Sequence, residues 1–206
     1  MTMQSRAHWE KVYTTKRPHE VSWYRPHLDV SLDLVTHAAP DHDAAIIDVG
    51  GGEATLVDDL LASGYRNVHV LDIAQAALDV AKARLGERAK HVTWLHGDLT
   101  TYGFEPAQFD VWHDRAVFHF LTDAPARAAY VRQVATALKP GGHAIVATFG
   151  PEGPAKCSGL DVARYDPAQL HGQFGASFRL LEHRTELHHT PAGAVQQFVY
   201  CWCRYG

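Results

Sequence analysis

The chain of 206 residues has few cysteines, no long apolar run and no run of basic residues. Its three cysteines, an odd number, do not make a disulfide framework, so a reducing cytoplasm is the expected location. No apolar stretch approaches the roughly 20 residues of a membrane span, and the first residues lack the apolar segment of a signal peptide. A net charge of -4 without clustered Lys and Arg argues against binding to a nucleic-acid backbone.

What the chain does contain is typical of a globular α/β protein, with 46% hydrophobic and 20% charged residues. Short apolar segments alternate with segments of helical pattern, which indicates βαβ units and a parallel sheet. The predicted strands cover 46–49, 68–71, 91–95, 109–113 and 143–149. The predicted helices cover 3–14, 28–39, 55–63, 74–85, 123–138 and 167–174. Lys139-Pro140-Gly141-Gly142 is expected to end a helix and form a turn.

The last part of the chain departs from this alternation. Two long strand-like segments, 177–189 and 195–204, are joined by only five residues. Strands joined by so short a loop must be antiparallel, because a parallel crossover needs about a dozen residues or more. The sequence therefore predicts a mostly parallel seven-stranded sheet that ends in an antiparallel hairpin, with helices on both faces.

The segment most informative about function is Ile46-Ile47-Asp48-Val49-Gly50-Gly51-Gly52-Glu53-Ala54-Thr55. An apolar strand breaks directly into three glycines, which let the backbone turn sharply and approach a ligand closely. A second apolar run ends at Asp72, twenty residues after Gly52. An acidic side chain at the end of the next strand can accept hydrogen bonds from a ribose. The pairing predicts a nucleoside-type ligand.

Five motifs in this order resemble one family. Asp48 to Ala54 match its glycine-rich turn, with Ala54 at a place where glycine is common, and Asp72 and Gly97-Asp98-Leu99 match its next two motifs. Phe109-Asp110, and His119-Phe120 followed by Leu138 to Gly142, match later landmarks. From Ile46 onward the chain thus resembles the class I S-adenosylmethionine-dependent methyltransferases. The resemblance implies a Rossmann-like fold and S-adenosyl-L-methionine as cofactor.

The resemblance also implies a set of cofactor contacts: Asp48, Gly50, Gly51, Gly52, Asp72, Ile73, Asp98, Leu99 and Trp23. In this reading Gly50 and Gly52 let the backbone run beside the methionine portion, Asp72 holds the ribose hydroxyls and Asp98 the adenine. Asp48 either touches the ligand or orients the loop. The alternative treats the glycines as an ordinary βα turn and both later aspartates as helix caps.

Residues after the fourth strand are candidates for chemistry at the methyl acceptor, since ligands bind at the carboxyl ends of parallel strands. The catalytic candidates are Asp114, Arg115 and His119. Asp114-Arg115 correspond to Asp-Lys in related protein-lysine methyltransferases, and His119 is either a general base or a structural histidine. Tyr24, Lys156 and Cys157 are the substrate candidates. The alternative for Lys156 and Cys157 is a surface lid without chemistry.

The N-terminal segment looks like the entry segment of small family members that act on thiols or protein lysines. Trp9, Tyr13, Trp23 and Tyr24 allow an aromatic cage for a cation, although Trp9 and Tyr13 lie one turn apart and are expected to be helix core. The C-terminal hairpin contains residue types that can bind zinc, namely His183, His188, His189, Cys201 and Cys203. No accepted ligand spacing repeats there, so we expect no metal.

We therefore expect one methyltransferase domain, residues 1–206, in three parts: a helical lid over 1–40, a cofactor-binding core over 41–150, and a substrate loop, last helix and hairpin over 151–206. The expected acceptor is a small molecule, with a protein lysine as the alternative. A nicotinamide-dependent oxidoreductase shares the glycine turn, but would have a third glycine at the position of Thr55 and no terminal hairpin. A non-catalytic cofactor-binding protein is a further alternative. The sequence carries no signal for an oligomeric state.

Overall fold

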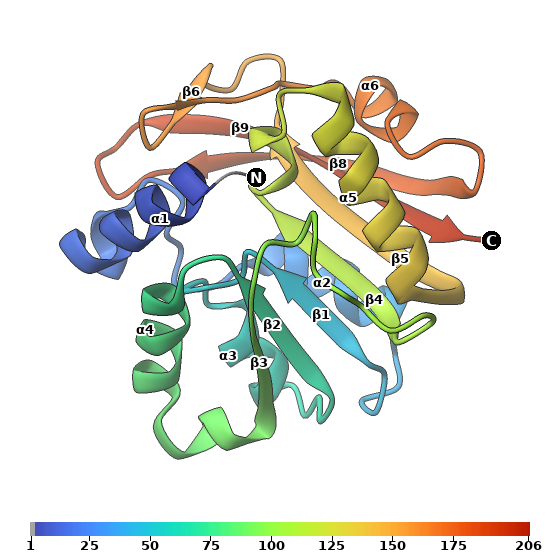
Figure 1. Cartoon of the computed structure of the whole chain (residues 1–206), viewed down its shortest axis with the longest axis horizontal. Helices are drawn as coiled ribbons and strands as arrows, with labels where there is room; N and C mark the ends of the chain where they lie inside the picture. Colours follow the sequence, from blue (N-terminus) through green and yellow to red (C-terminus); the bar gives the residue numbers. More distant parts are fainter. Residues whose placement is uncertain (1–2) are drawn as a thin grey trace.

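A seven-stranded sheet forms the centre of the fold (Figure 1). The computed structural model describes the backbone of residues 3–206 and the side chains from residue 6 onward. The strands of the sheet follow the order β3-β2-β1-β4-β5-β9-β8. They are β1 (Ile46–Val49), β2 (Val68–Asp72), β3 (Val92–His96), β4 (Phe109–Arg115), β5 (Leu138–Phe149), β8 (Phe178–His189) and β9 (Val195–Tyr205). The first five pair in parallel, and β9 pairs antiparallel with β5 and β8. The predicted fold class and terminal hairpin are confirmed.

Helices cover both faces of this sheet (Figure 1). The α-helices are α1 (Met3–Thr15), α2 (Asp29–Ala38), α3 (Leu56–Ala62), α4 (Gln75–Leu85), α5 (Ala124–Ala137) and α6 (Pro167–Gly172). Short 3-10 turns are η1 (Pro18–Glu20), η2 (Gly86–His91) and η3 (Phe118–Phe120). Helices α2, α3 and α4 share a buried apolar cluster with one face of the sheet, and α5 and α6 share another cluster with the opposite face.

The central strands are buried on both faces, which explains why their sequences read as apolar runs rather than as alternating patterns. Ile47 and Trp112 are register partners on β1 and β4 and pack toward α5. Their neighbours Ile46 and Val111, also register partners, pack toward α2 and α3. All four side chains are fully buried. The cores on the two faces of the sheet stabilise this order of strands. The order determines which carboxyl ends of the strands lie next to one another.

For the segment Lys139–Gly142 the predicted helix stop is confirmed, whereas the predicted turn between elements is wrong. Helix α5 does end at Ala137, but β5 begins at once with Leu138 and includes these residues. Leu138 pairs with Phe109, and the register then shifts before His143. Gly141 has φ +81°, a value that glycine adopts without strain. The glycines therefore form an irregularity inside a strand instead of a loop between elements.

The connection after β5 contains a small hairpin that the sequence did not predict. Strands β6 (Lys156–Cys157) and β7 (Leu160–Asp161) pair antiparallel across the two-residue turn Ser158-Gly159. Both turn residues have positive φ, at 49° and 80°, as the tight turns favoured in hairpins require. This hairpin lies at the same end of the sheet as α1 (Figure 1).

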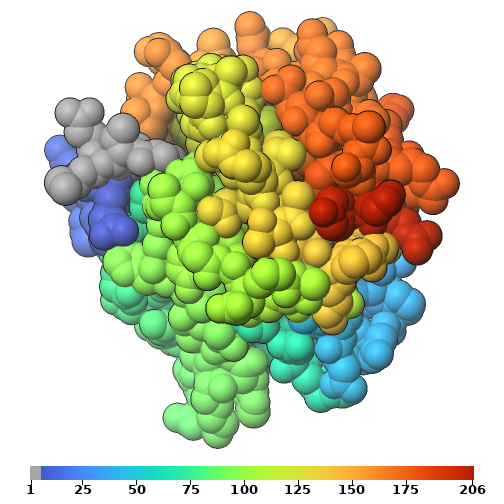
Figure 2. All heavy atoms as spheres, turned by 45° about the vertical axis from the view of Figure 1, so that its right-hand side comes forward, coloured from blue at the N-terminus to red at the C-terminus, as the bar shows by residue number. Residues whose placement is uncertain are grey.

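The C-terminal end of the chain lies at the opposite end of the sheet, where β5 begins. In the space-filling view its last residues lie at the surface beside the start of β5 (Figure 2), in keeping with the pairing of His143 with Arg204. Over the described residues, every helix is too short or too polar to cross a membrane.

Candidate cofactor and substrate site

A cavity lies at the carboxyl ends of β1, β2 and β4, covered by α1 and by the segment before α2. Its empty volume is about 1000 Å³, open solvent at the mouth included. Its position is the one at which open parallel sheets bind ligands. The lining residues are Trp9, Tyr13, Val21, Trp23, Tyr24, Arg25, Leu28, Asp48, Gly50, Gly51, Glu53, Ala54, Thr55, Leu71, Asp72, Ile73, Gly97, Leu99, His113, Arg115, Ala116, Val117, Phe120 and Cys157.

The glycine turn after β1 forms the floor of this cavity. Gly50 has φ +66°, and a Cβ at this position would collide with the side chain of Val117. A Cβ on Gly52 would lie 2.5 Å from Oδ2 of Asp72 and 2.7 Å from Cβ of Ala77. Real Cβ atoms do not approach other atoms so closely, so the backbone can hold this position only without side chains. The turn thus brings main chain against the carboxyl group that ends β2.

Two carboxyl groups at this end of the cavity are buried without a countercharge in contact. Asp72 is 4% exposed and accepts a hydrogen bond of 2.8 Å from the amide of Ala74, yet burial raises its pKa to about 7. Glu53 is also 4% exposed, and neither of its carboxyl oxygens has a hydrogen-bond partner in the described part of the chain. Burial raises the pKa of Glu53 to about 7, although the charge of Arg84 opposes this. Such groups are stabilised in their ionised form by a bound cation or hydrogen-bond donor.

Asp48, the third acidic residue at the cavity, is held by a partner. Nδ1 of His113 lies 2.7 Å from Oδ1 of Asp48, and Nε2 of the same ring lies 2.9 Å from Oγ of Ser31. All three side chains are at most 3% exposed. His113 therefore fixes the carboxylate of Asp48 behind the glycine turn and connects β4 to α2.

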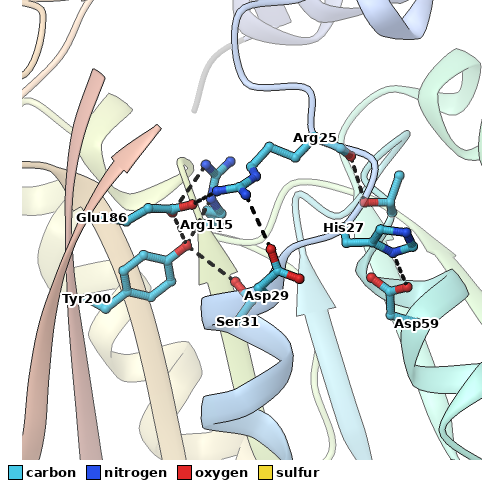
Figure 3. Close-up of polar contacts among 9 residues, drawn as sticks. Arg25, His27, Asp29, Ser31, Asp59, Arg115, Glu186 and Tyr200 are labelled. Carbon is cyan, nitrogen blue, oxygen red and sulfur yellow. Dashed lines mark hydrogen bonds and ion pairs between the residues drawn. The ribbon is translucent and has the colours of Figure 1, made fainter. Parts of the chain in front are cut away.

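The other end of the cavity is cationic (Figure 3). Arg115, at the end of β4, donates from Nε to the hydroxyl of Tyr200 (3.0 Å) and from Nη1 to the carbonyl of Trp23 (3.3 Å). Arg25 donates from Nη1 to Oε1 of Glu186, and Tyr200 donates to Oε2 of Glu186 at 2.9 Å. Burial alone would raise the pKa of Glu186, but Arg115, Tyr200 and Arg25 outweigh it and lower that pKa.

Helix α1 closes the cavity with aromatic side chains. The rings of Trp9 and Tyr13 stack at 5.9 Å, and Trp9 contacts Trp23 and Phe120 edge-on at 5.9 and 5.1 Å. The carboxylate of Glu10 accepts hydrogen bonds from the amides of Gln75 and Ala76 at the start of α4. Helix α4 begins three residues after Asp72. The helix is thereby fixed to the strand end that carries Asp72.

Two of the three catalytic candidates lie outside the cavity lining. Asp114 is fully buried and accepts from the amides of Val117 and Phe118 (2.9 and 3.0 Å) and from the hydroxyl of Tyr130 (2.7 Å). It thus orders the turn after β4. His119 is fully buried, and burial followed by the charge of Arg115 lowers its pKa to about 3. Only Arg115 of the three reaches the cavity.

The substrate candidates divide in the same way. Tyr24 and Cys157 line the cavity, whereas Lys156 is exposed and pairs with Asp161 on the neighbouring strand at 2.9 Å. Burial raises the pKa of the Cys157 thiol to about 11, which favours the uncharged thiol at neutral pH.

Most cofactor candidates lie at or directly behind the cavity wall. Ile73, Leu99 and Trp23 line it together with Asp48, Gly50, Gly51 and Asp72, and Gly52 backs it against Asp72. Asp98 lies between the lining residues Gly97 and Leu99, and its Oδ1 accepts from the amide and hydroxyl of Thr100 at 2.9 and 2.7 Å.

Sequence reasoning assigned no role to Glu53, Arg25 or Glu186. The role of Glu53 could have been predicted, because it directly follows the three glycines of the turn that is expected to contact the ligand. Arg25 and Glu186 are 161 residues apart, and no local pattern predicts their contact.

Within residues 6–206 no group of three or more potential ligands is arranged to hold a metal ion. Cys201 and Cys203 point into the apolar core between the sheet and α6.

Known proteins share this fold. A family model described as a methyltransferase domain matches residues 46–142. The ubiquinone biosynthesis O-methyltransferase of Ralstonia nicotianae is 30% identical over 142 residues, which are 68% of this chain and 56% of that protein. The eEF1A lysine and N-terminal methyltransferase of Mus musculus is 28% identical over 117 residues, 56% of this chain and 16% of that protein. The chain thus spans between about a sixth and about half of the length of these relatives.

Among solved structures, the N-methyltransferase NodS of Bradyrhizobium japonicum, in complex with S-adenosyl-L-homocysteine, aligns with a TM-score of 0.71 at 16% identity. The alignment covers 98% of this chain and 97% of that one. The match of the family model begins with β1 and includes the glycine turn and Asp72. The chain belongs to the class I S-adenosylmethionine-dependent methyltransferases.

Proposed function

We propose that this protein transfers the methyl group of S-adenosyl-L-methionine to a nucleophile on a small molecule. The observation that carries the proposal is the acidic, glycine-floored end of the cavity. There Asp72 and Glu53 are buried with pKa values of about 7, and the turn at Gly52 leaves no room for a side chain. Such a pair of carboxyl groups fits a ligand that has hydroxyl groups and positive charge.

The residues present fit this cofactor. Asp72, at the end of β2, would accept hydrogen bonds from the ribose, and the main chain at Gly50 to Gly52 would lie beside the methionine portion. Glu53 and Asp48 would face the positive charge of the ligand. Leu99, Ile73 and Trp23 would enclose the base, with Asp98 beside it. When bound, the cofactor supplies an activated methyl group on a sulfonium.

The chain's own contribution is to bind, orient and exclude water. Tyr24, Arg115 and Cys157 would face the acceptor from the covering segment, from β4 and from the β6–β7 hairpin. We assign Asp114 and His119 to the support of the turn after β4, because neither lines the cavity. A thiol with a pKa of about 11 gives Cys157 a packing role.

A small-molecule acceptor is supported by the closure of the site. Trp9 and Tyr13 of α1, Trp23 and the β6–β7 hairpin cover the cavity, and Glu10 fixes α1 to α4. The second candidate acceptor is a protein lysine or N-terminus. It is favoured by the similarity of residues in this chain to the eEF1A lysine and N-terminal methyltransferase.

Transfer of label distinguishes these two acceptors. The protein is incubated with methyl-labelled cofactor and a cell extract, and the products are separated into small molecules and proteins. We expect the label in the small-molecule fraction. Label confined to one protein band would refute the small-molecule assignment while leaving the methyltransferase activity intact. An Asp72→Ala variant serves as the control without cofactor binding.

We further propose that residues 1–206 form one domain with the three parts expected from the sequence, and that it acts in the cytoplasm. Its net charge of -4 supports a role without nucleic acid.

A further inference from the structure

We infer that the methyl acceptor carries a carboxylate, and that Arg115 is the group that binds it. This inference rests on the proposed methyltransferase function and names the substrate class of that same site. It depends on the contacts of one buried guanidinium group at the cationic end of the cavity.

The Arg115 side chain is only 5% exposed and incompletely paired. Its Nη2 atom is buried and has no hydrogen-bond acceptor among the described residues. The nearest carboxylate oxygen, Oε2 of Glu186, is 3.5 Å away, and it already accepts a hydrogen bond from Tyr200. A buried donor left unpaired in this way is costly, and it is more so when it is charged. Arg115, a residue that lines the cavity, therefore keeps one charged donor without a hydrogen-bond acceptor among the described residues.

Two guanidinium groups, those of Arg25 and Arg115, meet at this end of the cavity. Arg25 and Arg115 share the single buried carboxylate of Glu186, and the other partner of Arg25, Asp29, is 72% exposed (Figure 3). The pKa of the nearby His188 is lowered, first by burial and further by Arg115 and Arg25. An anionic ligand would therefore complement the charge of the guanidinium groups at this end of the cavity.

The guanidinium group is held in a fixed orientation. Its Cζ lies 4.2 Å from the ring centroid of Phe198, while Nε and Nη1 are bound by Tyr200 and by the carbonyl of Trp23. A planar, preorganised guanidinium loses little entropy when it binds a carboxylate. The fixed orientation of the guanidinium group therefore suits it to bind a carboxylate on a ligand as well as to neutralise Glu186.

The position of Arg115 separates it from the acidic end of the site. Arg115 ends β4 and Asp72 ends β2, and these two strands flank β1. At about 4.8 Å between neighbouring strands, the two strand ends lie about 10 Å apart. A cofactor held at Asp72 and Glu53 thus leaves the Arg115 end for the acceptor.

The number of donors selects a carboxylate over a phosphate ester. A phosphate presents three strong acceptor oxygens and about two negative charges. Here one guanidinium nitrogen of Arg115 lacks a hydrogen-bond acceptor among the described residues, and the cavity lining includes the apolar side chains of Val21, Trp23, Leu28 and Phe120. A monoanion on an apolar or aromatic body matches this environment.

Binding of matched probes to the protein saturated with S-adenosyl-L-homocysteine tests the inference. The probes are benzoate, benzamide and phenyl phosphate, and dissociation constants are measured by ligand-observed NMR. Because one charge-assisted hydrogen bond is at stake, we expect benzoate to bind at least about 10-fold more tightly than benzamide. Equal affinity for the two, or no binding of benzoate, would overturn the inference. Tighter binding of phenyl phosphate would overturn the carboxylate assignment.

Two variants assign the preference to a residue. Arg115→Gln should remove the preference for benzoate while binding of S-adenosyl-L-homocysteine persists. Arg184→Gln is the matched control, since Arg184 pairs with Asp33 and Glu182 away from the cavity, and it should retain the preference. A preference unchanged in Arg115→Gln contradicts the inference. If Arg115→Gln does not fold, the comparison of probes in the wild-type protein still decides. Failure of S-adenosyl-L-homocysteine itself to bind would instead refute the proposed function.

Discussion

The unpaired carboxyl group of Glu53 makes the stability of this protein depend on pH in a way that one substitution removes. The residue is 4% exposed, neither carboxyl oxygen has a hydrogen-bond partner among the residues that the structure describes, and burial raises its pKa from 4.5 to about 7. Glu53→Gln keeps the shape of the side chain and removes its charge. A comparison of the two proteins therefore measures the free-energy cost of ionising this buried carboxyl group when no cationic ligand is bound.

The sign follows from the direction of the pKa change. A carboxyl group whose pKa is higher in the folded state contributes stability that is fully present below about pH 4.5 and is lost as the pH rises to about 7. At about 1.36 kcal/mol per pH unit, the full loss is about 3 kcal/mol, and relaxation of the site reduces it. Glu53→Gln avoids this loss. Without ligand, the variant should exceed the wild type by about 1–3 kcal/mol near pH 8 and match it closely near pH 5.

Urea unfolding of both proteins near pH 5 and near pH 8 measures this difference. Glu87→Gln is the control, because the Glu87 side chain is 95% exposed and should show no such dependence on pH. A free-energy difference for Glu53→Gln that is the same at both pH values would refute the reasoning. In the same variant, the affinity for S-adenosyl-L-methionine should fall about 10-fold, since a charge-assisted contact is lost.

Three further substitutions test the acidic end of the cavity and its cover. Asp72→Ala should abolish cofactor binding in a calorimetric titration while the circular dichroism spectrum stays unchanged; unaltered affinity would contradict the ribose assignment. Gly52→Val places a Cβ 2.5 Å from Oδ2 of Asp72 and should weaken cofactor binding at least about 10-fold, so normal affinity would count against the close approach of the turn. Glu10→Ala removes the acceptor for the amides of Gln75 and Ala76 and should cost about 1 kcal/mol and speed proteolysis within α1. Unchanged proteolysis of α1 would show that Glu10 does not fix it.

Much of the fold could be predicted because its determinants are local. The apolar runs of β1 and β2, the glycine at the end of α4 and the short link between β8 and β9 each act within a few residues. The glycine turn and Asp72 could be recognised for the same reason. The sequence does not predict the start of β5, because Lys139–Gly142 has turn chemistry locally and lies within the strand because Leu138 and His143 on either side of it pair with β4.

Tyr24, Arg115 and Cys157 could be named from the sequence, but the contacts at the acceptor end of the site could not be predicted, because they are long-range. Arg25 meets Glu186 across 161 residues, and Arg115 meets Tyr200 across 85. His119 has the chemistry of a base, but its position under Phe149 rather than in the cavity is decided by the packing of η3 against β5. Residue type proposes a role, and only the fold decides whether the side chain reaches the ligand.

The central claim is that the acidic, glycine-floored end of the cavity binds S-adenosyl-L-methionine. Calorimetric titration of the wild-type protein with S-adenosyl-L-homocysteine, with oxidised nicotinamide adenine dinucleotide as the comparison ligand, tests it directly. We predict saturable binding of one S-adenosyl-L-homocysteine per chain and no binding of the dinucleotide. Absence of binding by S-adenosyl-L-homocysteine, or saturable binding of the dinucleotide in its place, would contradict the assignment.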